Sequence, residues 1–300
     1  MTIAISGTTG ITLDGQFNSA SSMGFKNRII NGQMQIAQRA TSATITAGST
    51  IAAGYSTVDR FYVYCTGANV TAAQVAGSGA TKNRLQITGA ASVTAVGIGQ
   101  RIEALNSYDM AGSTSTLSLD ISNSLLTTVT WTAYYANTAD TFGTLASPTR
   151  TQIATGTFTV TSTLTNYSAQ ISIPAAATTG IEVVFTVGAQ TSGTWVIGNI
   201  QLEKGSTATS FDYRPYGTEL ALCQRYYEAG TVYLETGLTG GGARAGLTGF
   251  RVTKRSSPTV TLSSTTNSPT VGGVVNVDGF VVFNTTGNYY QGNFAAVSEL

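Results

Sequence analysis

Tyrosine rings accompanied by amide side chains are the groups in this sequence best suited to bind another molecule. Sugars stack against aromatic planes and hydrogen-bond to Asn, Gln, Asp and Arg groups. Tyr62 and Tyr134 lie in runs that alternate as β-strands do, each opposite its core-facing neighbours. Asn288, Tyr289 and Tyr290 lie in GNYYQGN, which is expected to be an exposed loop. We therefore take these five residues as candidate glycan contacts.

Catalytic chemistry has little support in the sequence. The chain contains no His, the commonest general base and the usual partner of a Ser or Cys nucleophile. Glycoside cleavage needs two facing carboxylates, about 5–9.5 Å apart depending on mechanism, and the 14 acidic residues are scattered. Asp120 and Glu182 are expected on polar strand faces, so a polysaccharide depolymerase remains an alternative if either pairs with another acid. We expect no catalytic residues and no enzymatic activity.

Metal and thiol chemistry have equally little support in the sequence. Cys65 and Cys223 are too few for a disulfide framework or a Cys-only zinc site, and their aromatic surroundings indicate buried free thiols. Asp59, Asp109 and Asp140 could contribute to a structural calcium ion, but their spacing does not match an oxygen-ligand pattern. We expect no cofactor and no metal site.

The charge content excludes several partners. Only 10% of residues are charged and the net charge is +1, so no basic face is available to neutralise nucleic-acid phosphates. No apolar run approaches the ~18 residues of a membrane span, and the first residues, MTIAISGTTG, lack the pattern of a signal peptide. These features indicate a soluble protein, made in a cytoplasm, that functions inside an assembly.

Alternation of apolar and polar residues defines the expected fold. In TLSLDIS, Leu117, Leu119 and Ile121 point one way, while VTWTAYYA places Trp131 among its core-facing residues. Such runs recur without helical periods between them, and Asn31-Gly32 adds a hairpin signal. The prediction is an all-β chain: an antiparallel jelly-roll β-sandwich with a short helix and a smaller C-terminal β-module.

Composition divides the chain into four segments. Residues 1–24 are rich in Gly, Ser and Thr and are expected to form a docking arm that orders against a partner chain. Residues 25–216 form the sandwich, residues 217–230 a linker helix, and residues 231–300 the C-terminal β-module. The last segment is marginal in size, so we expect it to dock on the sandwich or on a sister chain.

The stretch 211–228, FDYRPYGTELALCQRYYE, contains the clearest helix signals. Thr218 is a candidate N-cap, and Leu220, Cys223 and Tyr227 fall on one apolar stripe. A helix this short must pack on something to be stable in water. We interpret six residues as a structural junction rather than an active site: Arg214, Tyr216, Glu219, Cys223, Arg225 and Tyr227.

Two long motifs resemble a known family. Residues 27–39 read NRIINGQMQIAQR, and residues 195–227 read WVIGNIQLEKGSTATSFDYRPYGTELALCQRYY. Both are similar to runs in a family of bacteriophage tail-fibre and tail-associated virion proteins, and RSSPTVTL and the last residues SEL resemble its C-terminal module. The resemblance implies a jelly roll like that of carbohydrate-binding modules, assembly as a homotrimer, a place on the virion, and no catalytic residues.

The sequence therefore predicts a non-enzymatic virion protein, a short fibre or tail-associated protein. It would attach to another virion protein through residues 1–24 and contribute to recognition of a host-surface polysaccharide. Two alternatives remain. One is a purely structural decoration or connector of the head, neck or baseplate, and the other is the depolymerase. No nucleic acid and no membrane insertion are expected.

Overall fold

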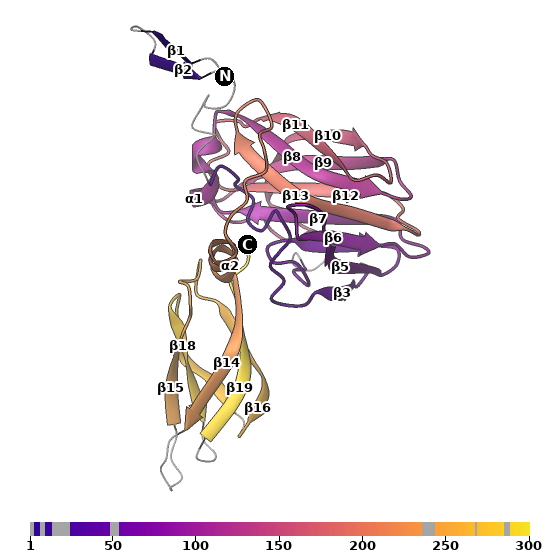
Figure 1. Cartoon of the computed structure of the whole chain (residues 1–300). Helices are drawn as coiled ribbons and strands as arrows, with labels where there is room; N and C mark the ends of the chain where they lie inside the picture. The colour runs from indigo at the N-terminus through magenta and orange to yellow at the C-terminus, as the bar shows by residue number, and fades with distance from the viewer. Residues whose placement is uncertain are drawn as a thin grey trace.

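The computed structural model describes residues 3–6, 10–13, 25–48, 54–235, 244–267, 269–284 and 289–300. It confirms the predicted fold class: the chain is all-β, with an antiparallel jelly-roll β-sandwich, a short helix and smaller C-terminal sheets (Figure 1). The arm expected at residues 1–24 lies largely outside the described residues. Within it, β1 (Ile3–Ser6) pairs with β2 (Gly10–Leu13) as an antiparallel hairpin.

The sandwich consists of a five-stranded and a six-stranded sheet. Their strand orders are β10–β9–β12–β7–β4 and β11–β8–β13–β6–β5–β3. The five-stranded sheet contains β4 (Tyr62–Thr66), β7 (Ala95–Ile102), β9 (Thr128–Ala136), β10 (Arg150–Thr159) and β12 (Ile181–Val187). The six-stranded sheet contains β3 (Ser42–Ile45), β5 (Val70–Ala76), β6 (Asn83–Thr88), β8 (Thr114–Asn123), β11 (Thr165–Ser172) and β13 (Thr194–Lys204). Every pairing is antiparallel, so the chain needs no crossover helices.

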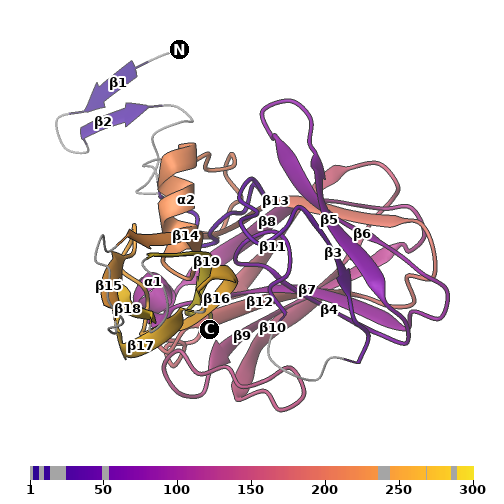
Figure 2. The ribbon, with the colours of Figure 1, turned by 90° about the horizontal axis from the view of Figure 1, so that it is seen from below.

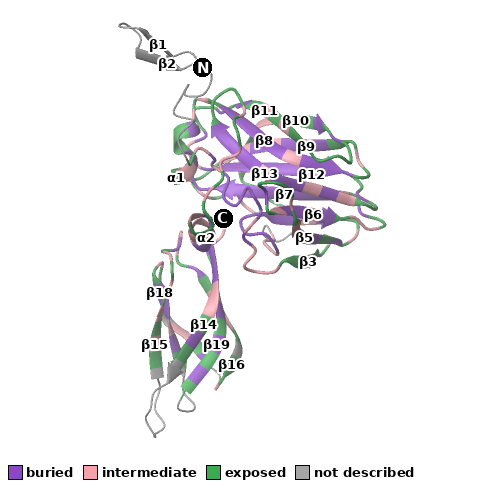
Figure 3. Cartoon of the chain, viewed as in Figure 1, coloured by how far each residue is buried: buried purple, intermediate pink, exposed green. Residues whose placement is uncertain are grey.

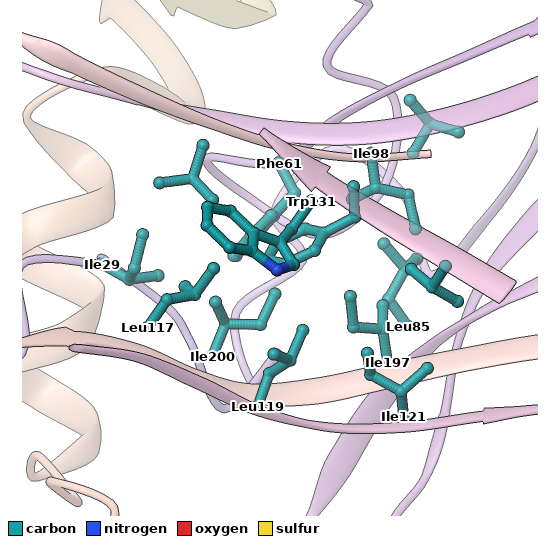
Figure 4. Close-up of a cluster of buried hydrophobic side chains, with 14 of the residues drawn as sticks. Ile29, Phe61, Leu85, Ile98, Leu117, Leu119, Ile121, Trp131, Ile197 and Ile200 are labelled. Atoms are coloured by element: carbon teal, nitrogen blue, oxygen red, sulfur yellow. The ribbon is translucent and has the colours of Figure 1, made fainter. Parts of the chain in front are cut away.

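The core between the two sheets follows the predicted alternation. Leu117, Leu119 and Ile121 of β8 are fully buried, and Trp131 of β9 lies among them and their neighbours (Figure 4). Both cysteines are buried and free, as expected. Successive residues of a strand point to opposite faces, so the residues between these core positions lie on the outer faces of the sandwich.

The Asn31-Gly32 pair forms a turn, but the prediction of a hairpin there is wrong. No strand flanks it on either side, and the segment instead runs beside the end of β13. The Asn27 side chain donates to the Ile200 carbonyl at 2.9 Å and accepts from the Leu202 amide at 3.0 Å. A Cβ at Gly32 would lie 2.1 Å from the Ile200 carbonyl oxygen, so only glycine fits. The two motifs of the family resemblance therefore lie side by side.

The linker helix is shorter than the expected range 217–230. Helix α2 covers Tyr216–Gln224, with Pro215 rather than Thr218 at its N-cap, and Tyr227 already belongs to strand β14 (Tyr227–Glu235). Proline suits a helix start because its missing N–H would have no helical partner there. Cys223 is fully buried in a small cluster with Ile30, Ile36 and Tyr226, so the helix packs against the 25–41 segment as a short helix must.

Two three-stranded sheets follow α2. Their orders are β14–β19–β16 and β15–β18–β17, built from β14, β15 (Arg244–Gly249), β16 (Thr259–Thr266), β17 (Thr270–Val275), β18 (Gly279–Asn284) and β19 (Tyr289–Val297). Their common core is small and centres on Phe280, Val282 and Phe294. Figure 2 shows these strands gathered at one side of the sandwich next to α2. Figure 3 shows that buried residues are more extensive in the sandwich than in the C-terminal sheets.

Two short helices, α1 (Ala104–Ser107) and η2 (Tyr108–Met110), connect β7 to β8. Within the ranges given above, no helix is long and apolar enough to cross a membrane.

Candidate functional site

Two tyrosine rings lie flat on the outer face of the five-stranded sheet. Tyr62 and Tyr64 of β4 pair with Gly99 and Gly97 of β7, while Val63 between them points into the core. A Cβ at Gly97 or at Gly99 would lie 2.2 Å from the facing tyrosine ring. The absent side chains of the two glycines are what allow the rings to lie across the neighbouring strand. The rings are nearly parallel, with centroids 6.4 Å apart and an interplanar angle of 24°.

A buried carboxylate ties this face together. Glu182 of β12 is fully buried and accepts 2.8 Å hydrogen bonds from the Tyr62 hydroxyl and from Arg101 Nε. It also pairs with Arg150 of β10. A buried carboxylate is tolerable only when it is paired and hydrogen-bonded, which two guanidinium groups and one hydroxyl achieve here. Glu182 therefore fixes the positions of three side chains contributed by three different strands.

The second aromatic position is Tyr134. It lies on β9 opposite Glu182, and the Arg150 guanidinium carbon is 4.0 Å from the centroid of its ring. Beyond Tyr134, the outer face carries hydroxyl and amide groups that are half-buried or exposed, among them Thr132, Thr155 and Gln152. Rings bordered by neutral hydrogen-bonding groups are suited to a ligand with apolar faces and a hydroxyl rim.

A cavity of about 180 Å³ opens beside Tyr64. Its walls come from the edge strands β3 and β4, from the 54–56 segment and from Leu145, which also packs near Tyr62 and Tyr134. The polar lining consists of hydroxyl groups: Thr44, Thr46, Ser56 and Tyr64. None of the described residues that line this cavity is charged, so it suits a neutral, hydroxyl-rich group.

Electrostatics on this face follow from burial and from Glu182. Burial, reinforced by the nearby Glu182 charge, raises the pKa of Tyr62 well above 10, and burial also raises the pKa of Tyr64. Burial alone would lower the pKa of Arg150, but the Glu182 carboxylate outweighs it and raises the pKa. Both tyrosines are therefore neutral hydroxyl donors at neutral pH, and Arg150 is charged.

The candidate glycan contacts that the structure describes lie in two separate parts of the molecule, and two of them are buried. Tyr62 is fully buried beneath its neighbours and Tyr290 is only 2% exposed in the core of the C-terminal sheets, so both predictions of surface contacts are wrong. Tyr134 is half-buried on the described face and Tyr289 is exposed on β19, far along the chain in a separate sheet. Asn288 lies outside the described residues.

Tyr64 is not among the five residues that the sequence singled out as glycan contacts. Tyr62 and Tyr64 alternate on one face and look equivalent in the sequence. The structure separates them, because Tyr62 is fully buried with the Tyr55 ring packed edge-on 6.0 Å away, whereas Tyr64 is half-buried and lines the cavity. AVGIG, with glycines two residues apart, marks a strand that leaves room on one face for large side chains, but its two glycines face both tyrosines and do not select Tyr64.

Asp120 and Glu182 do not form a catalytic pair with each other. They lie on β8 and β12, which belong to different sheets, and each is already engaged. Asp120 accepts hydrogen bonds from Arg84, Asn166 and Asn199 at 2.8–3.0 Å. Glu182 is enclosed by two arginines and a tyrosine hydroxyl and is not exposed to a substrate.

The three aspartates considered for calcium lie in separate places. Asp59 is buried and accepts hydrogen bonds from Gln38, Asp109 pairs with Arg28, and Asp140 accepts from the Ala104 amide. Among the residues whose positions are described, no group of three or more Cys, Asp or Glu side chains could hold a metal ion.

The residues assigned to the junction surround the start and end of α2. Arg214 donates to the Asn27 and Ile29 carbonyls and pairs with Glu219, whose carboxylate accepts from the Asn31 amide at 2.5 Å. Burial raises the pKa of Glu219, and the Arg214 charge opposes that shift.

The other junction residues contact the sandwich. Arg225 makes two hydrogen bonds to the buried Glu103, at 3.0 and 3.2 Å, and the Tyr227 ring lies beneath the Arg39 guanidinium, 3.7 Å away. Burial raises the pKa of Cys223 well above its ordinary value. Tyr216 is exposed, so it does not take part in these buried contacts.

Comparison with known proteins gives a distant match of fold. The sequence matches no protein-family model and no curated protein. Similar solved structures include a putative sugar binding protein from Bacteroides thetaiotaomicron, with 13% identity and a TM-score of 0.39 over 60% of this chain and 100% of that chain. TmCBM61 in complex with β-1,4-galactotriose has 9% identity and a TM-score of 0.36, over 60% of this chain and 99% of its own.

A third similar structure is the enzymatically active domain of tailspike protein 4 of bacteriophage CBA120. It has 16% identity and a TM-score of 0.36, over 54% of this chain, which spans only 22% of the tailspike chain. The neighbours thus include carbohydrate-binding modules and a phage tailspike domain, at a distance that says nothing about what this chain binds.

Proposed function

We propose that this protein binds a neutral, hydroxyl-rich saccharide on the outer face of its five-stranded sheet and has no catalytic activity. The observation that carries the proposal is the Tyr64 ring, which lies over Gly97 and lines a cavity whose polar side chains are hydroxyl groups. Tyr134 offers a second ring on the same face, and Glu182 and Arg150 fix its surroundings. Stacking on rings and hydrogen bonds to hydroxyl groups are the interactions that such a ligand needs.

We further propose that the protein is part of a bacteriophage particle, as a short fibre or tail-associated protein that contacts the host surface. Support comes from the two long motifs and from a surface with few charges, which suits a member of an assembly. Immunogold labelling of particles with an antibody to this chain tests the location: labelling of the tail or its base supports it, and unlabelled particles would rule it out.

Saccharide binding is tested on an array of bacterial surface oligosaccharides. The wild-type protein is expected to bind at least one class, and Tyr64→Ala to lower the affinity for it about tenfold, the loss expected from about 1.4 kcal/mol of stacking. Tyr213→Ala, which removes a partly exposed ring beside the six-stranded sheet, is the matched control and should bind normally. Absence of binding by the wild type, or equal losses in the two variants, would overturn the proposal.

A purely structural connector is the second candidate, favoured by the junction itself. The motif residues Asn27, Gly32, Arg214 and Glu219 are all engaged in holding the chain together, and none of them faces the candidate site. A connector would show no saccharide binding in the array while still labelling the particle, so the same two experiments separate the candidates.

A further inference from the structure

The last three residues of the sequence leave the C-terminal sheets and return to the sandwich. Strand β19 ends at Val297, and the Ser298 amide then donates to the Tyr226 carbonyl at 2.8 Å. The Glu299 carboxylate pairs with Arg39 at 3.1 Å and with Arg60. Arg60 and Glu299 are 1% and 7% exposed, so this ion pair is buried, and the Arg60 guanidinium lies 3.4 Å from the centroid of the Tyr226 ring, just after α2.

Arg101 receives this segment and connects it to the candidate site. Its Nη1 donates to the Leu300 carbonyl at 2.8 Å, its Nε to Glu182 at 2.8 Å, and its Nη2 to the Gly143 carbonyl at 3.0 Å. Arg60 adds a second connection, because it donates to the Arg101 carbonyl at 2.6 Å while it holds Glu299. One guanidinium group thus joins the 298–300 segment, the carboxylate beneath the rings, and the loop that carries Leu145.

We infer that Glu299 is a positioning residue for the saccharide face, acting through Arg60 and Arg101 on Glu182 and on the 138–149 loop. The ligand in this inference, a saccharide, rests on the proposed function, whereas the coupling between Glu299 and the 138–149 loop does not depend on it. Removing the Glu299 carboxylate would leave the buried Arg60 without its charge partner and would release the 298–300 segment from Arg39 and Arg60. Arg101 would then lose the support that Arg60 gives to its backbone carbonyl and the firm placement of its Leu300 partner. Leu145 and Arg150 would be less firmly placed, and so would the Tyr64 cavity and the Tyr134 ring.

Hydrogen exchange of the protein without ligand tests the coupling. In Glu299→Ala, amides of the 138–149 loop are expected to exchange about tenfold faster than in the wild type, which corresponds to about 1.4 kcal/mol of lost local stability. Asp278→Ala is the matched control, since Asp278 is an exposed acid of the C-terminal sheets whose side chain accepts one hydrogen bond, from Thr253. Unchanged loop exchange in Glu299→Ala, or the same increase in Asp278→Ala, would overturn the inference.

Two further measurements keep the test decisive. If Glu299→Ala does not fold, Glu299→Gln replaces it, because the amide keeps the shape of the side chain and removes only the charge. On the wild type, a saturating oligosaccharide chosen from the array should slow exchange at Ser298, Glu299 and Leu300, since coupling between two sites is reciprocal. No slowing there would contradict the inference even if the saccharide binds.

The affinity readout distinguishes this inference from the proposed function. Glu299→Ala should weaken oligosaccharide binding about tenfold, although the residue lies outside the cavity lining. If the wild type binds no saccharide, the proposed function fails, while the loop-exchange comparison still decides whether Glu299 positions the face.

Discussion

The two outer faces of the sandwich treat their acidic residues differently. On the five-stranded face, Glu182 is sealed beneath aromatic rings with two arginines, and its pairing positions those rings. On the six-stranded face, Asp120 is 17% exposed and accepts hydrogen bonds from one arginine and two amides. Arginine–carboxylate pairs thus lie buried beneath aromatic rings on the five-stranded face, whereas on the six-stranded face they form part of the polar surface.

This contrast indicates which face can bind a ligand. Near the six-stranded sheet, the segments around residues 27–32 and 209–214 are used to bind β13 and α2 to each other. The five-stranded face instead keeps a half-buried ring and a cavity. Three experiments test this contrast between the faces.

The largest effect is expected from the buried carboxylate. Glu182→Gln leaves Arg101 and Arg150 with no charge partner at 3% and 13% exposure, so the free energy of unfolding should fall by about 3–5 kcal/mol. Asp120→Asn on the other face should cost about 1–2 kcal/mol, because its hydrogen bonds are partly replaceable by water. Denaturant unfolding of both variants measures the two losses, and equal losses would erase the contrast between the faces.

A medium effect is expected from filling the space beneath a ring. Gly97→Ala places a Cβ 2.2 Å from the Tyr64 ring, which must move, so stability should fall by about 1–3 kcal/mol and oligosaccharide affinity should fall with it. Gly188→Ala is the control, since nothing lies within 4 Å of its added Cβ, and its stability should change by less than about 0.5 kcal/mol. Normal affinity in Gly97→Ala would show that the ring's placement on glycine is irrelevant to binding.

The smallest effect concerns alkaline pH. Burial and the Glu182 charge raise the pKa of folded Tyr62 well above 10, whereas the unfolded tyrosine ionises near 10. The unfolded state therefore binds fewer protons above pH 10, and stability should be lost as pH rises from there toward the folded pKa. Tyr62→Phe should show a shallower alkaline loss and cost about 1 kcal/mol at pH 7 for the hydrogen bond. Unfolding curves between pH 7 and 11 measure both quantities, and an unchanged slope would contradict the assignment.

Local pattern was enough to predict the sandwich. The alternation of Leu117, Leu119 and Ile121 fixes which face of β8 is buried, because successive strand residues point in opposite directions. The free, buried state of Cys65 and Cys223 also followed from their neighbours. The prediction of a hairpin at Asn31-Gly32 was wrong, because a turn dipeptide specifies local backbone geometry but not the strands that its flanking residues pair with.

The candidate site shows where such pattern reasoning stops. Tyr62 and Tyr64 have the same type, the same strand and the same face, and the sequence gives no reason to choose between them. Tertiary packing separates them: Tyr62 is fully buried in a cluster that includes Tyr55, Tyr134 and Leu145, whereas Tyr64 is half-buried and lines the cavity. The roles of Glu182 and Glu299 were invisible for the same reason: each depends on arginines that lie far from it along the chain.

The fold class and the faces of the strands can thus be predicted from local pattern, because they depend on side-chain period and on neighbours along the chain. Which tyrosine lines the cavity, which acid is buried beneath the rings, and the contact of residues 298–300 with Arg101 emerge from tertiary packing. Those features depend on contacts between segments far apart in the sequence, and no local period encodes them.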